Sequence, residues 1–257
     1  MLTGKKVLIT GASSGIGALT AQMLAKRGAV PILTGRNEAK LKEASSLIGG
    51  RHGVYVLDVN DNAEVQRVTQ QIIADYEGLD VLLNNAGYAV FDYFEDAKVE
   101  DFEEMMNTNY MGIVRCTKAI LPVFLRQGYG QIVNVASMAG KIGTAKSTAY
   151  TATKHAVLGF TNALRAEMKG KGITVSAVNP GPIDTPFFTK ADPEGTYVRN
   201  VQAFMMKPER VSAAILKVID KGIAEVDLPL SAAAGIKLYQ LFPRLADRLV
   251  GPMLNKK

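Results

Sequence analysis

The sequence contains little cysteine and no long apolar run, and each of these absences excludes a class of protein. The single cysteine, Cys116, cannot form an intrachain disulfide, which indicates a reducing compartment, and its helical neighbours favour a buried core thiol. No apolar run approaches the roughly eighteen residues of a transmembrane helix. The first residues also lack an apolar signal region, because Lys5 and Lys6 lead directly into Val7–Ile9. We therefore expect a cytoplasmic protein.

Clustered charge and metal ligands are equally scarce. The formal net charge is +6, and five cations against the single acid Asp247 in residues 231–257 account for most of it. The rest of the chain is nearly neutral, which argues against a nucleic-acid-binding face. No cluster of histidine, cysteine and carboxylate residues has the spacing of metal ligands, and this includes His52 and His155. We therefore predict no metal site.

Short runs rich in Val, Ile and Leu alternate with longer segments of helical spacing. The predicted strands are Lys6–Thr10, Val30–Thr34, Gly53–Leu57, Val81–Asn84, Gln131–Val135, Thr174–Val178 and Glu225–Leu228. The predicted helices are Ile16–Arg27, Ala39–Ile48, Asn62–Tyr76, Val99–Gln127, Tyr150–Gly170 and Ser212–Lys221, with a last one from near Ser231. This alternation predicts a doubly wound α/β fold, and the lack of repeats or linkers predicts a single domain over residues 1–257.

Two segments depart from the alternation. Residues 179–207 are rich in proline and glycine and carry Phe187, Phe188 and Tyr197, which favours a substrate lid over a disordered insertion. Residues 231–257 form a basic amphipathic tail in which Pro243 should kink or split any helix. Three uses compete for this tail: covering the substrate cleft, forming a dimer contact, or lying on an anionic membrane surface.

A glycine-rich turn joins the first predicted strand to the first predicted helix. Its small residues let the backbone approach a pyrophosphate at the positive end of the helix, and hydroxyl groups in the turn can donate to the phosphates. The Gly-x-x-x-Gly-x-Gly spacing differs from the commoner Gly-x-Gly-x-x-Gly, and turns also need glycine for steric reasons alone. The candidate cofactor residues of this turn are Gly11, Ser13, Ser14, Gly15, Ile16 and Gly17.

The end of the second predicted strand indicates which dinucleotide would bind. NAD-preferring sites usually carry an acid here to hold the ribose 2′-hydroxyl, whereas this chain has Gly35 and Arg36. Arg36 can pair with a 2′-phosphate, so we predict NADP(H) as the cofactor. The alternative is that Arg36 is a solvated loop cation.

The ends of the third and fourth predicted strands add candidates for the adenosine end of the cofactor. Asp58, followed by Val59, could accept from the adenine amino group or instead cap the helix that begins near Asn62. The small residues of Asn84-Asn85-Ala86-Gly87 suit a backbone close to the adenine ribose. Asn84 or Asn85 could also join neighbouring strands, so we expect a mixed structural and cofactor role.

Three residues suited to proton transfer follow in order. Ser137 lies thirteen residues before Tyr150, and Lys154 lies four residues after it, on the same helix face. The lysine charge would favour tyrosinate and lower the pKa of the phenol. A core tyrosine, a surface lysine and a helix-capping serine are the plain alternatives.

Taken together, these motifs resemble those of the short-chain dehydrogenases/reductases over residues 5–228. The resemblance is carried by Thr10-Gly11-x-x-x-Gly15-Ile16-Gly17, Asn84-Asn85-Ala86-Gly87, Asn109, Ser137, Tyr150-x-x-x-Lys154 and Pro180-Gly181. It implies a Rossmann-type sheet of about seven parallel strands with helices on both faces. It also implies hydride transfer between nicotinamide and a carbonyl or alcohol carbon.

The resemblance further implies a role for each matching residue. Tyr150 would exchange a proton with the substrate oxygen, Ser137 would hydrogen-bond that oxygen, and Lys154 would also hold the nicotinamide ribose. Asn109, rather than the nearby Asn107, would support a proton-relay water. The nicotinamide carboxamide would be held by the segment containing Pro180, Gly181, Ile183 and Thr185.

The substrate pocket is expected between Tyr88–Tyr93, Met138–Thr144 and Phe187–Tyr197, with lysines at its rim: Lys141, Lys146 and Lys190. These segments are mostly apolar, which favours a hydrophobic ketone, aldehyde or secondary alcohol. One alternative is a 3-oxoacyl thioester reductase, whose basic surface would dock an acidic carrier protein. Another is a catalytically silent NADP(H)-sensing protein. The resemblance implies a homodimer or homotetramer, with peripheral membrane contact through the tail as the remaining alternative.

Overall fold

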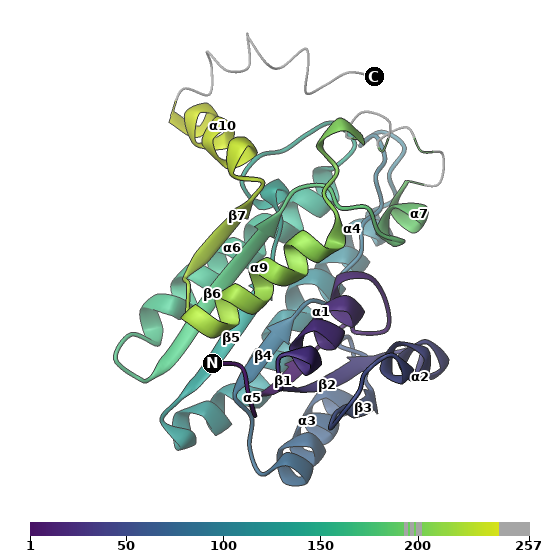
Figure 1. Cartoon of the computed structure of the whole chain (residues 1–257). Helices are drawn as coiled ribbons and strands as arrows, with labels where there is room; N and C mark the ends of the chain where they lie inside the picture. Colours follow the sequence, from purple (N-terminus) through teal and green to yellow (C-terminus); the bar gives the residue numbers. More distant parts are fainter. Residues whose placement is uncertain (193–194, 196–197, 199–201, 242–257) are drawn as a thin grey trace.

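The computed structural model describes residues 1–192, 195, 198 and 202–241 (Figure 1). Its centre is one parallel sheet with the strand order β3-β2-β1-β4-β5-β6-β7. The strands are β1 (Lys6–Ile9), β2 (Val30–Gly35), β3 (Gly53–Val56), β4 (Val81–Asn84), β5 (Gly130–Val135), β6 (Ile173–Pro180) and β7 (Glu225–Leu228). The predicted Rossmann-type fold with seven parallel strands is therefore confirmed.

Helices cover both faces of the sheet (Figure 1). One face is packed by α1 (Gly15–Lys26), α2 (Glu38–Ser46) and α9 (Pro208–Lys221). The other is packed by α3 (Asn62–Tyr76), α5 (Gly112–Gln127) and α6 (Thr148–Glu167). The remaining helices are α4 (Val99–Met106), the π-helical η1 (Asn107–Met111), the 3₁₀ turns η2 (Met138–Gly140) and η3 (Gln202–Phe204), α7 (Phe187–Ala191) and α10 (Leu230–Leu241).

Successive strand residues enter opposite cores, as the period of a β-strand requires. In β1, Val7 and Ile9 pack with the α1 and α9 side chains, whereas Leu8 packs with Phe124 and its neighbours on α5. Both faces are buried, which explains why the strands appear in the sequence as continuous apolar runs. Cys116 lies in the second core, and burial raises the pKa of its thiol to about 12.

Two predicted segments need correction. The helix expected over Val99–Gln127 is interrupted by the π-helical turn η1. The lid expected over residues 179–207 is not one long loop, because Asn179 and Pro180 extend β6 by pairing with β7, and α7 and η3 follow. The parts of this lid at residues 193–194, 196–197 and 199–201, including Tyr197, lie outside the described residues.

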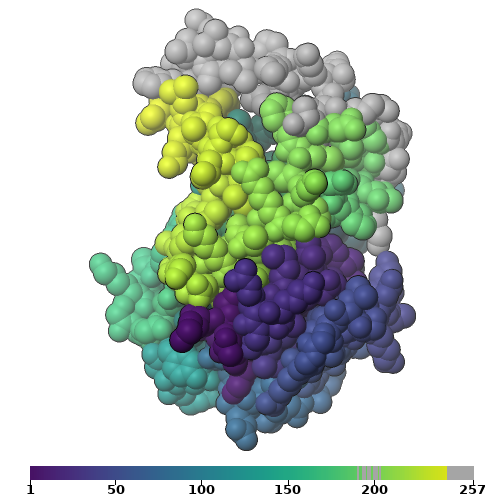
Figure 2. All heavy atoms as spheres, viewed as in Figure 1, coloured from purple at the N-terminus to yellow at the C-terminus, as the bar shows by residue number. Residues whose placement is uncertain are grey.

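Helix α10 lies on the outside of the molecule (Figure 2). Ala233 is its buried residue, whereas Leu230, Leu238 and Leu241 are exposed. Residues 242–257, with Pro243, lie outside the described part, so the three predicted uses of the tail stay predictions. No helix among the described residues is long and apolar enough to span a membrane.

The start of β5 depends on a close contact between a glycine and an aromatic ring. A Cβ added at Gly130 would lie 2.2 Å from Cγ of the buried Phe124. We expect Gly130→Ala to lower the free energy of unfolding by about 1–3 kcal/mol, because the ring has to move within a close-packed core. Urea denaturation measures this change. In the double variant with Phe124→Leu the two losses should be less than additive, and full additivity would contradict the overlap.

Candidate active site

The glycine turn is held in place by contacts between the carboxyl ends of β1 and β4. The Thr10 hydroxyl accepts hydrogen bonds from the backbone N–H groups of Asn85 and Ala86, each at 3.0 Å. The Asn85 amide donates to the carbonyls of Thr10 and Gly11 at 3.0 and 3.1 Å. Gly11 has φ +66°, and a Cβ there would lie 2.7 Å from the Ala86 Cα. The turn therefore requires glycine both for its conformation and for its packing.

The turn leads into the N-terminus of α1, which begins at Gly15. A Cβ on Gly17 would lie 2.5 Å from the Gly11 carbonyl oxygen, so the helix can begin this close to the turn only with glycine. Among the described residues, the Ser14 side chain makes no capping bond at this helix end. The first N–H groups of α1 can therefore donate to an anion. This bed of small residues below a helix N-terminus fits the pyrophosphate of a dinucleotide.

The segment that follows β6 lies opposite the start of α1. The Thr185 Cβ is 4.0 Å from the position that a Gly15 Cβ would occupy. Ile183 is buried and pairs with Met206, and Gly181 donates its N–H to the Leu228 carbonyl at 2.7 Å. The structure thus brings the predicted carboxamide-binding segment to the glycine turn.

The predicted adenosine end is formed by residues after β2 and β3. The Arg36 guanidinium is mostly exposed and lies 3.9 Å from the Asp58 carboxylate, which accepts from the Asn60 N–H at 2.9 Å. The alternative in which Asp58 caps α3 is wrong, because Asp61 caps it by accepting from Glu64 N–H at 3.0 Å. A Cβ on Gly35 would lie 3.4 Å from the Ser13 hydroxyl, which places Ser13 beside the end of β2. Val59, after Asp58, is buried.

The two asparagines at the end of β4 have different structural roles. The Asn84 amide donates to Asn134 at 2.9 Å and to Thr117 at 3.3 Å, which joins β4 to β5 and α5. Asn85 holds the glycine turn. Gly87 lies above the lysine of α6, since its Cβ position is 3.9 Å from Lys154 Nζ.

Tyr150 and Lys154 lie on the same face of α6. Lys154 Nζ is 5.6 Å from the centre of the Tyr150 ring and donates to the Val135 carbonyl at 3.0 Å. The lysine side chain is buried, and this burial lowers its pKa to about 8. At neutral pH the group is therefore a cation placed against the tyrosine.

Ser137 follows β5, two residues beyond the Val135 carbonyl. Its hydroxyl accepts from the Ala139 N–H at 3.0 Å, so it caps η2, and it donates to the Pro180 carbonyl at 3.3 Å. The donated bond is long, so a substrate oxygen can compete for this proton.

Asn109, within η1, is fully buried and bonds both to the segment after β4 and to α6. Its carboxamide oxygen accepts from the Tyr88 N–H at 3.0 Å, and its amide donates to the Tyr88 carbonyl at 2.9 Å and to Thr153 at 3.1 Å. Thr153 precedes Lys154 on α6. Asn107 instead accepts from Arg115 at 2.7 Å, so Asn109 is the asparagine that the structure places beside the lysine.

An aromatic cluster surrounds Tyr150. The Phe91 and Phe187 rings make edge contacts with the Tyr150 ring at centroid distances of 5.7 and 5.9 Å. Phe188 stacks on Phe91 at 6.1 Å, so α7 closes this side of the site. Two of the expected substrate segments therefore meet at Tyr150.

Two of the lysines expected at the pocket rim have other partners. Lys146 lies over the Tyr93 ring at 4.6 Å. Lys141 is not a rim residue, because its side chain is 17% exposed and pairs with Glu225 and Asp227. Sequence reasoning gave no role to these two acids or to Asn179, which bonds both of them. The feature of the sequence that could have indicated a role for them is the presence of two acids within the short strand β7.

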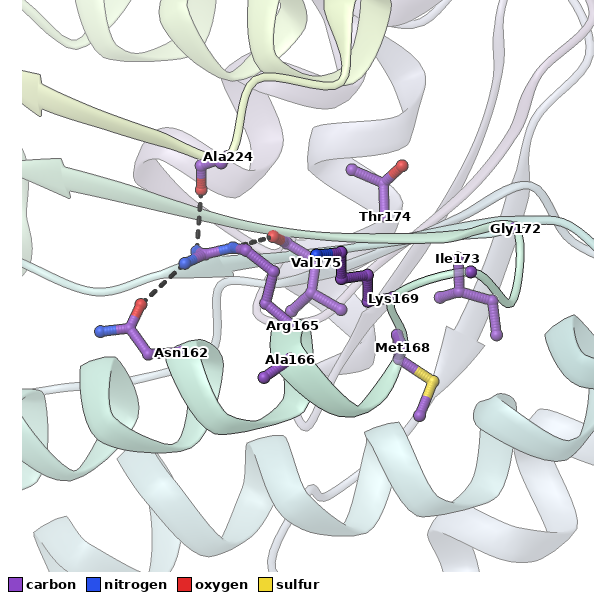
Figure 3. A pocket seen from close by; sticks show the side chains of 11 residues that line it. Asn162, Arg165, Ala166, Met168, Lys169, Gly172, Ile173, Thr174, Val175 and Ala224 are labelled. Atoms are coloured by element: carbon purple, nitrogen blue, oxygen red, sulfur yellow. Dashed lines mark hydrogen bonds between the residues drawn. The ribbon is translucent and has the colours of Figure 1, made fainter.

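A surface depression lies near the other end of β6 (Figure 3). Its central guanidinium, Arg165, donates to the carbonyls of Val175 and Ala224 and to the Asn162 side chain. These bonds join α6 to β6 and to the residue that precedes β7. Within the described residues, no group of three His, Cys, Asp or Glu side chains is arranged as metal ligands.

The profile of the short chain dehydrogenase family matches residues 5–196 of this chain. The chain belongs to this family. The short-chain dehydrogenase is therefore an oxidoreductase that acts on CH–OH or C=O groups, and its family uses a nicotinamide cofactor.

Relatives and solved structures agree with this assignment. An uncharacterized oxidoreductase of Bacillus subtilis, YxnA, is 34% identical, the match covering 97% of this chain and 72% of the relative. The 3-oxoacyl-[acyl-carrier-protein] reductase FabG of Thermotoga maritima is 36% identical over 84% of this chain and 90% of the relative. A short-chain dehydrogenase structure from Streptomyces avermitilis matches with TM-score 0.83, 27% identity and 97% of both chains covered. A serine dehydrogenase in its closed form with NADP⁺ matches with TM-score 0.80 and 30% identity over 88% of this chain and 95% of that chain.

The buried lysine predicts a measurable dependence of stability on pH. Burial depresses the Lys154 pKa from its ordinary value of 10.5 to about 8 in the folded protein. Below pH 8 the charged group opposes folding, and stability is regained as the pH rises from about 8 towards 10.5. We expect Lys154→Met to stabilise the cofactor-free protein at pH 7 by about 1–3 kcal/mol and to stabilise it less at pH 10. Urea denaturation at both pH values tests this, and a difference independent of pH would contradict it.

Proposed function

We propose that this short-chain dehydrogenase transfers a hydride between NADP(H) and a hydrophobic ketone, aldehyde or secondary alcohol, with Tyr150 as the proton donor or acceptor. The observation that carries the proposal is the buried Lys154 ammonium, 5.6 Å from the centre of the Tyr150 ring. A cation at this place stabilises tyrosinate and so makes the phenol a better acid.

Each residue of the site has a part in the reduction of a carbonyl. The bound nicotinamide supplies the hydride. Tyr150 gives its proton to the carbonyl oxygen, and the Lys154 charge stabilises the tyrosinate that remains. Ser137 turns its hydroxyl from the Pro180 carbonyl to the substrate oxygen, where negative charge develops. Asn109 keeps the Tyr88 backbone and Thr153 in place beside the lysine. Alcohol oxidation runs the same steps in reverse.

The preference for NADP(H) is supported by the end of β2. Gly35 provides no carboxylate that would repel a 2′-phosphate, and the mostly exposed Arg36 guanidinium is available to pair with one. The NADP⁺ complex of the serine dehydrogenase neighbour agrees with this choice. Asp58, 3.9 Å from Arg36, would then serve both to orient the guanidinium and to accept from the adenine.

The hydrophobic substrate is supported by the rings of Phe91, Phe187 and Phe188 around Tyr150. Burying an apolar group among them is favourable, whereas a charged group would lose its hydration. A second substrate class, the 3-oxoacyl thioesters, is supported by the similarity to a 3-oxoacyl-[acyl-carrier-protein] reductase. Its acyl chain would meet the same aromatic cluster.

Tyr150→Phe tests the proposed chemistry. We expect NADPH oxidation with a panel of hydrophobic ketones, aldehydes and 3-oxoacyl thioesters to fall by about a hundredfold or more, because the proton donor is lost. NADPH binding, followed by cofactor fluorescence, should stay within about threefold of the wild type. Tyr129→Phe, at an exposed tyrosine before β5, is the control. Equal turnover in wild type and Tyr150→Phe would refute the assignment of the proton donor.

Arg36→Asp tests the choice of cofactor. We expect the ratio of NADPH to NADH affinity to fall by about ten- to a hundredfold, since one charge-assisted contact to the 2′-phosphate is lost. Arg126→Asp, at an exposed residue in the last turn of α5, makes the same charge change at the opposite edge of the sheet, where β5 begins. Dissociation constants for both cofactors decide the matter. Equal weakening of NADPH and NADH binding would show that Arg36 does not read the phosphate.

A further inference from the structure

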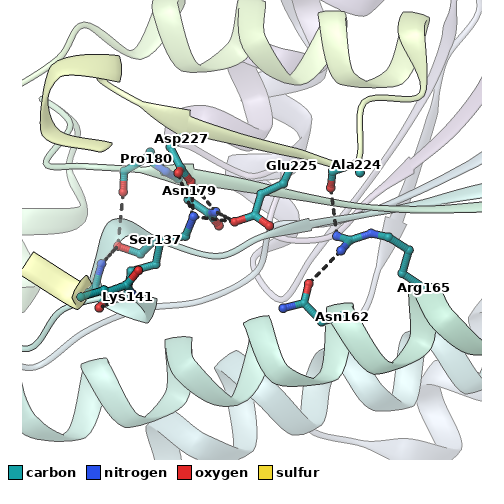
Figure 4. A network of polar contacts seen from close by, with 11 residues as sticks. Ser137, Lys141, Asn162, Arg165, Asn179, Pro180, Ala224, Glu225 and Asp227 are labelled. Carbon is teal, nitrogen blue, oxygen red and sulfur yellow. Dashed lines mark hydrogen bonds and ion pairs between the residues drawn. The ribbon is translucent and has the colours of Figure 1, made fainter. Parts of the chain in front are cut away.

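A cluster of charged side chains lies directly beside Ser137 (Figure 4). Lys141 Nζ is 2.5 Å from the Glu225 carboxylate and 2.6 and 2.8 Å from the two oxygens of Asp227. The side chains of Lys141 and Asp227 are only 17% and 12% exposed. The Glu225 side chain is 32% exposed, so the cluster as a whole is partly buried, unlike an ordinary surface ion pair.

The cluster closes a ring of contacts that includes the catalytic candidate. Ser137 begins the η2 turn and Lys141 ends it, so the ion pairs fix one end of the turn that carries the serine. On the other side, the Asn179 amide donates to Glu225 at 2.8 Å and to Asp227 at 2.7 Å. The carbonyl of the next residue, Pro180, accepts a hydrogen bond from the Ser137 hydroxyl. The serine is therefore held from both sides by elements that Lys141 and its acids join.

Fold stability alone does not explain this arrangement. Removing charges from water costs free energy, and buried ion pairs are often no more stabilising than apolar groups of similar size. Two carboxylates also share a single cation here, which leaves a net negative charge in the cluster. A partly buried cluster of this kind instead fixes the positions of its side chains, because its hydrogen bonds admit few arrangements.

We propose that Lys141 is a positioning residue for the reaction. Its ion pairs with Glu225 and Asp227 fix the η2 turn and thereby hold the Ser137 hydroxyl at the substrate oxygen. The inference rests on the proposed function, in which Ser137 stabilises developing charge. A displacement of about 1 Å in such a group lowers turnover by about a hundredfold.

Lys141→Met tests the proposal, with Lys141→Arg as the conservative variant and Lys217→Met, on the exposed face of α9, as the control. We expect Lys141→Met to lower kcat by about ten- to a hundredfold, with KM and NADPH binding within about threefold of the wild type. Lys141→Arg should recover most of kcat, because its guanidinium can pair with both acids.

The triple variant Lys141→Met, Glu225→Gln, Asp227→Asn separates positioning from stability. Without uncompensated charge it should regain the thermal stability that Lys141→Met alone loses, while kcat stays low. Recovery of kcat together with stability would overturn the proposal, as would a kcat for Lys141→Met within twofold of the wild type.

Hydrogen exchange in residues 137–141 gives a readout that needs no turnover. Lys141→Met should accelerate exchange in this segment, whereas Lys217→Met should not. If the wild type turns over no substrate of the panel, the proposed function fails, and exchange alone then decides whether Lys141 holds the turn. Unchanged exchange in Lys141→Met would overturn that part too.

Discussion

The burial of the Lys154 ammonium is the constraint around which the site is arranged. A charged group inside a protein is costly, and here the Val135 carbonyl accepts its hydrogen bond. A Cβ on Gly87 would lie 2.9 Å from the Asn109 carboxamide oxygen, so the segment after β4 can pass this close to Asn109 only with glycine at that position. Asn109 fixes that segment through the Tyr88 backbone. The position of the cation against Tyr150 therefore depends on residues from three different elements.

The parallel sheet makes this convergence possible. The strands β1, β4, β5 and β6 all end at one edge, so the residues that follow them become neighbours although they are far apart in the sequence. At the point where the strand order reverses, Thr10 and Asn85 join β1 to β4 directly. These hydrogen bonds fix the conformation of the glycine turn, and the turn in turn fixes where α1 begins. The cofactor cradle and the proton-transfer residues thus share one framework.

The sequence predicted the framework well because its causes are local. Val81–Asn84 was predicted to the residue, since a strand buried on both faces leaves a continuous apolar run ended by a polar group. Glu225–Leu228 was also predicted to the residue, although this edge strand alternates two acids with Val226 and Leu228 and is only partly buried. Gly11 was predictable because its positive φ restricts the residue type. The family and its fold followed from these motifs. Side-chain partners were less predictable: Asp58 and Asp61 both precede α3, and only the path of the loop decides which one caps it.

Lys141 shows the same limit more clearly. It looked like a rim cation because its acids are 84 and 86 residues further along the chain, and only the pairing of β6 with β7 brings them near. Likewise, the apolar segment around Phe187 indicated a lid but not the short helix α7. Contacts that depend on which strands are adjacent cannot be read from local patterns of residues.

Lys154 is buried and Lys141 is partly buried, and the pKa values of these two lysines shift in opposite directions, which suits different tasks. Burial lowers the pKa of Lys154 to about 8, so its charge responds to small changes around the site. Burial also acts on Lys141, but its hydrogen bonds to Asp227 and Glu225 outweigh burial and raise its pKa, so this charge is permanent. A permanent charge is a good anchor, and a responsive one can assist a proton transfer. Placing either charge away from water lowers the stability of the fold. Both lysines lie where the proposed chemistry requires side chains in fixed positions, and this requirement outweighs the loss of stability.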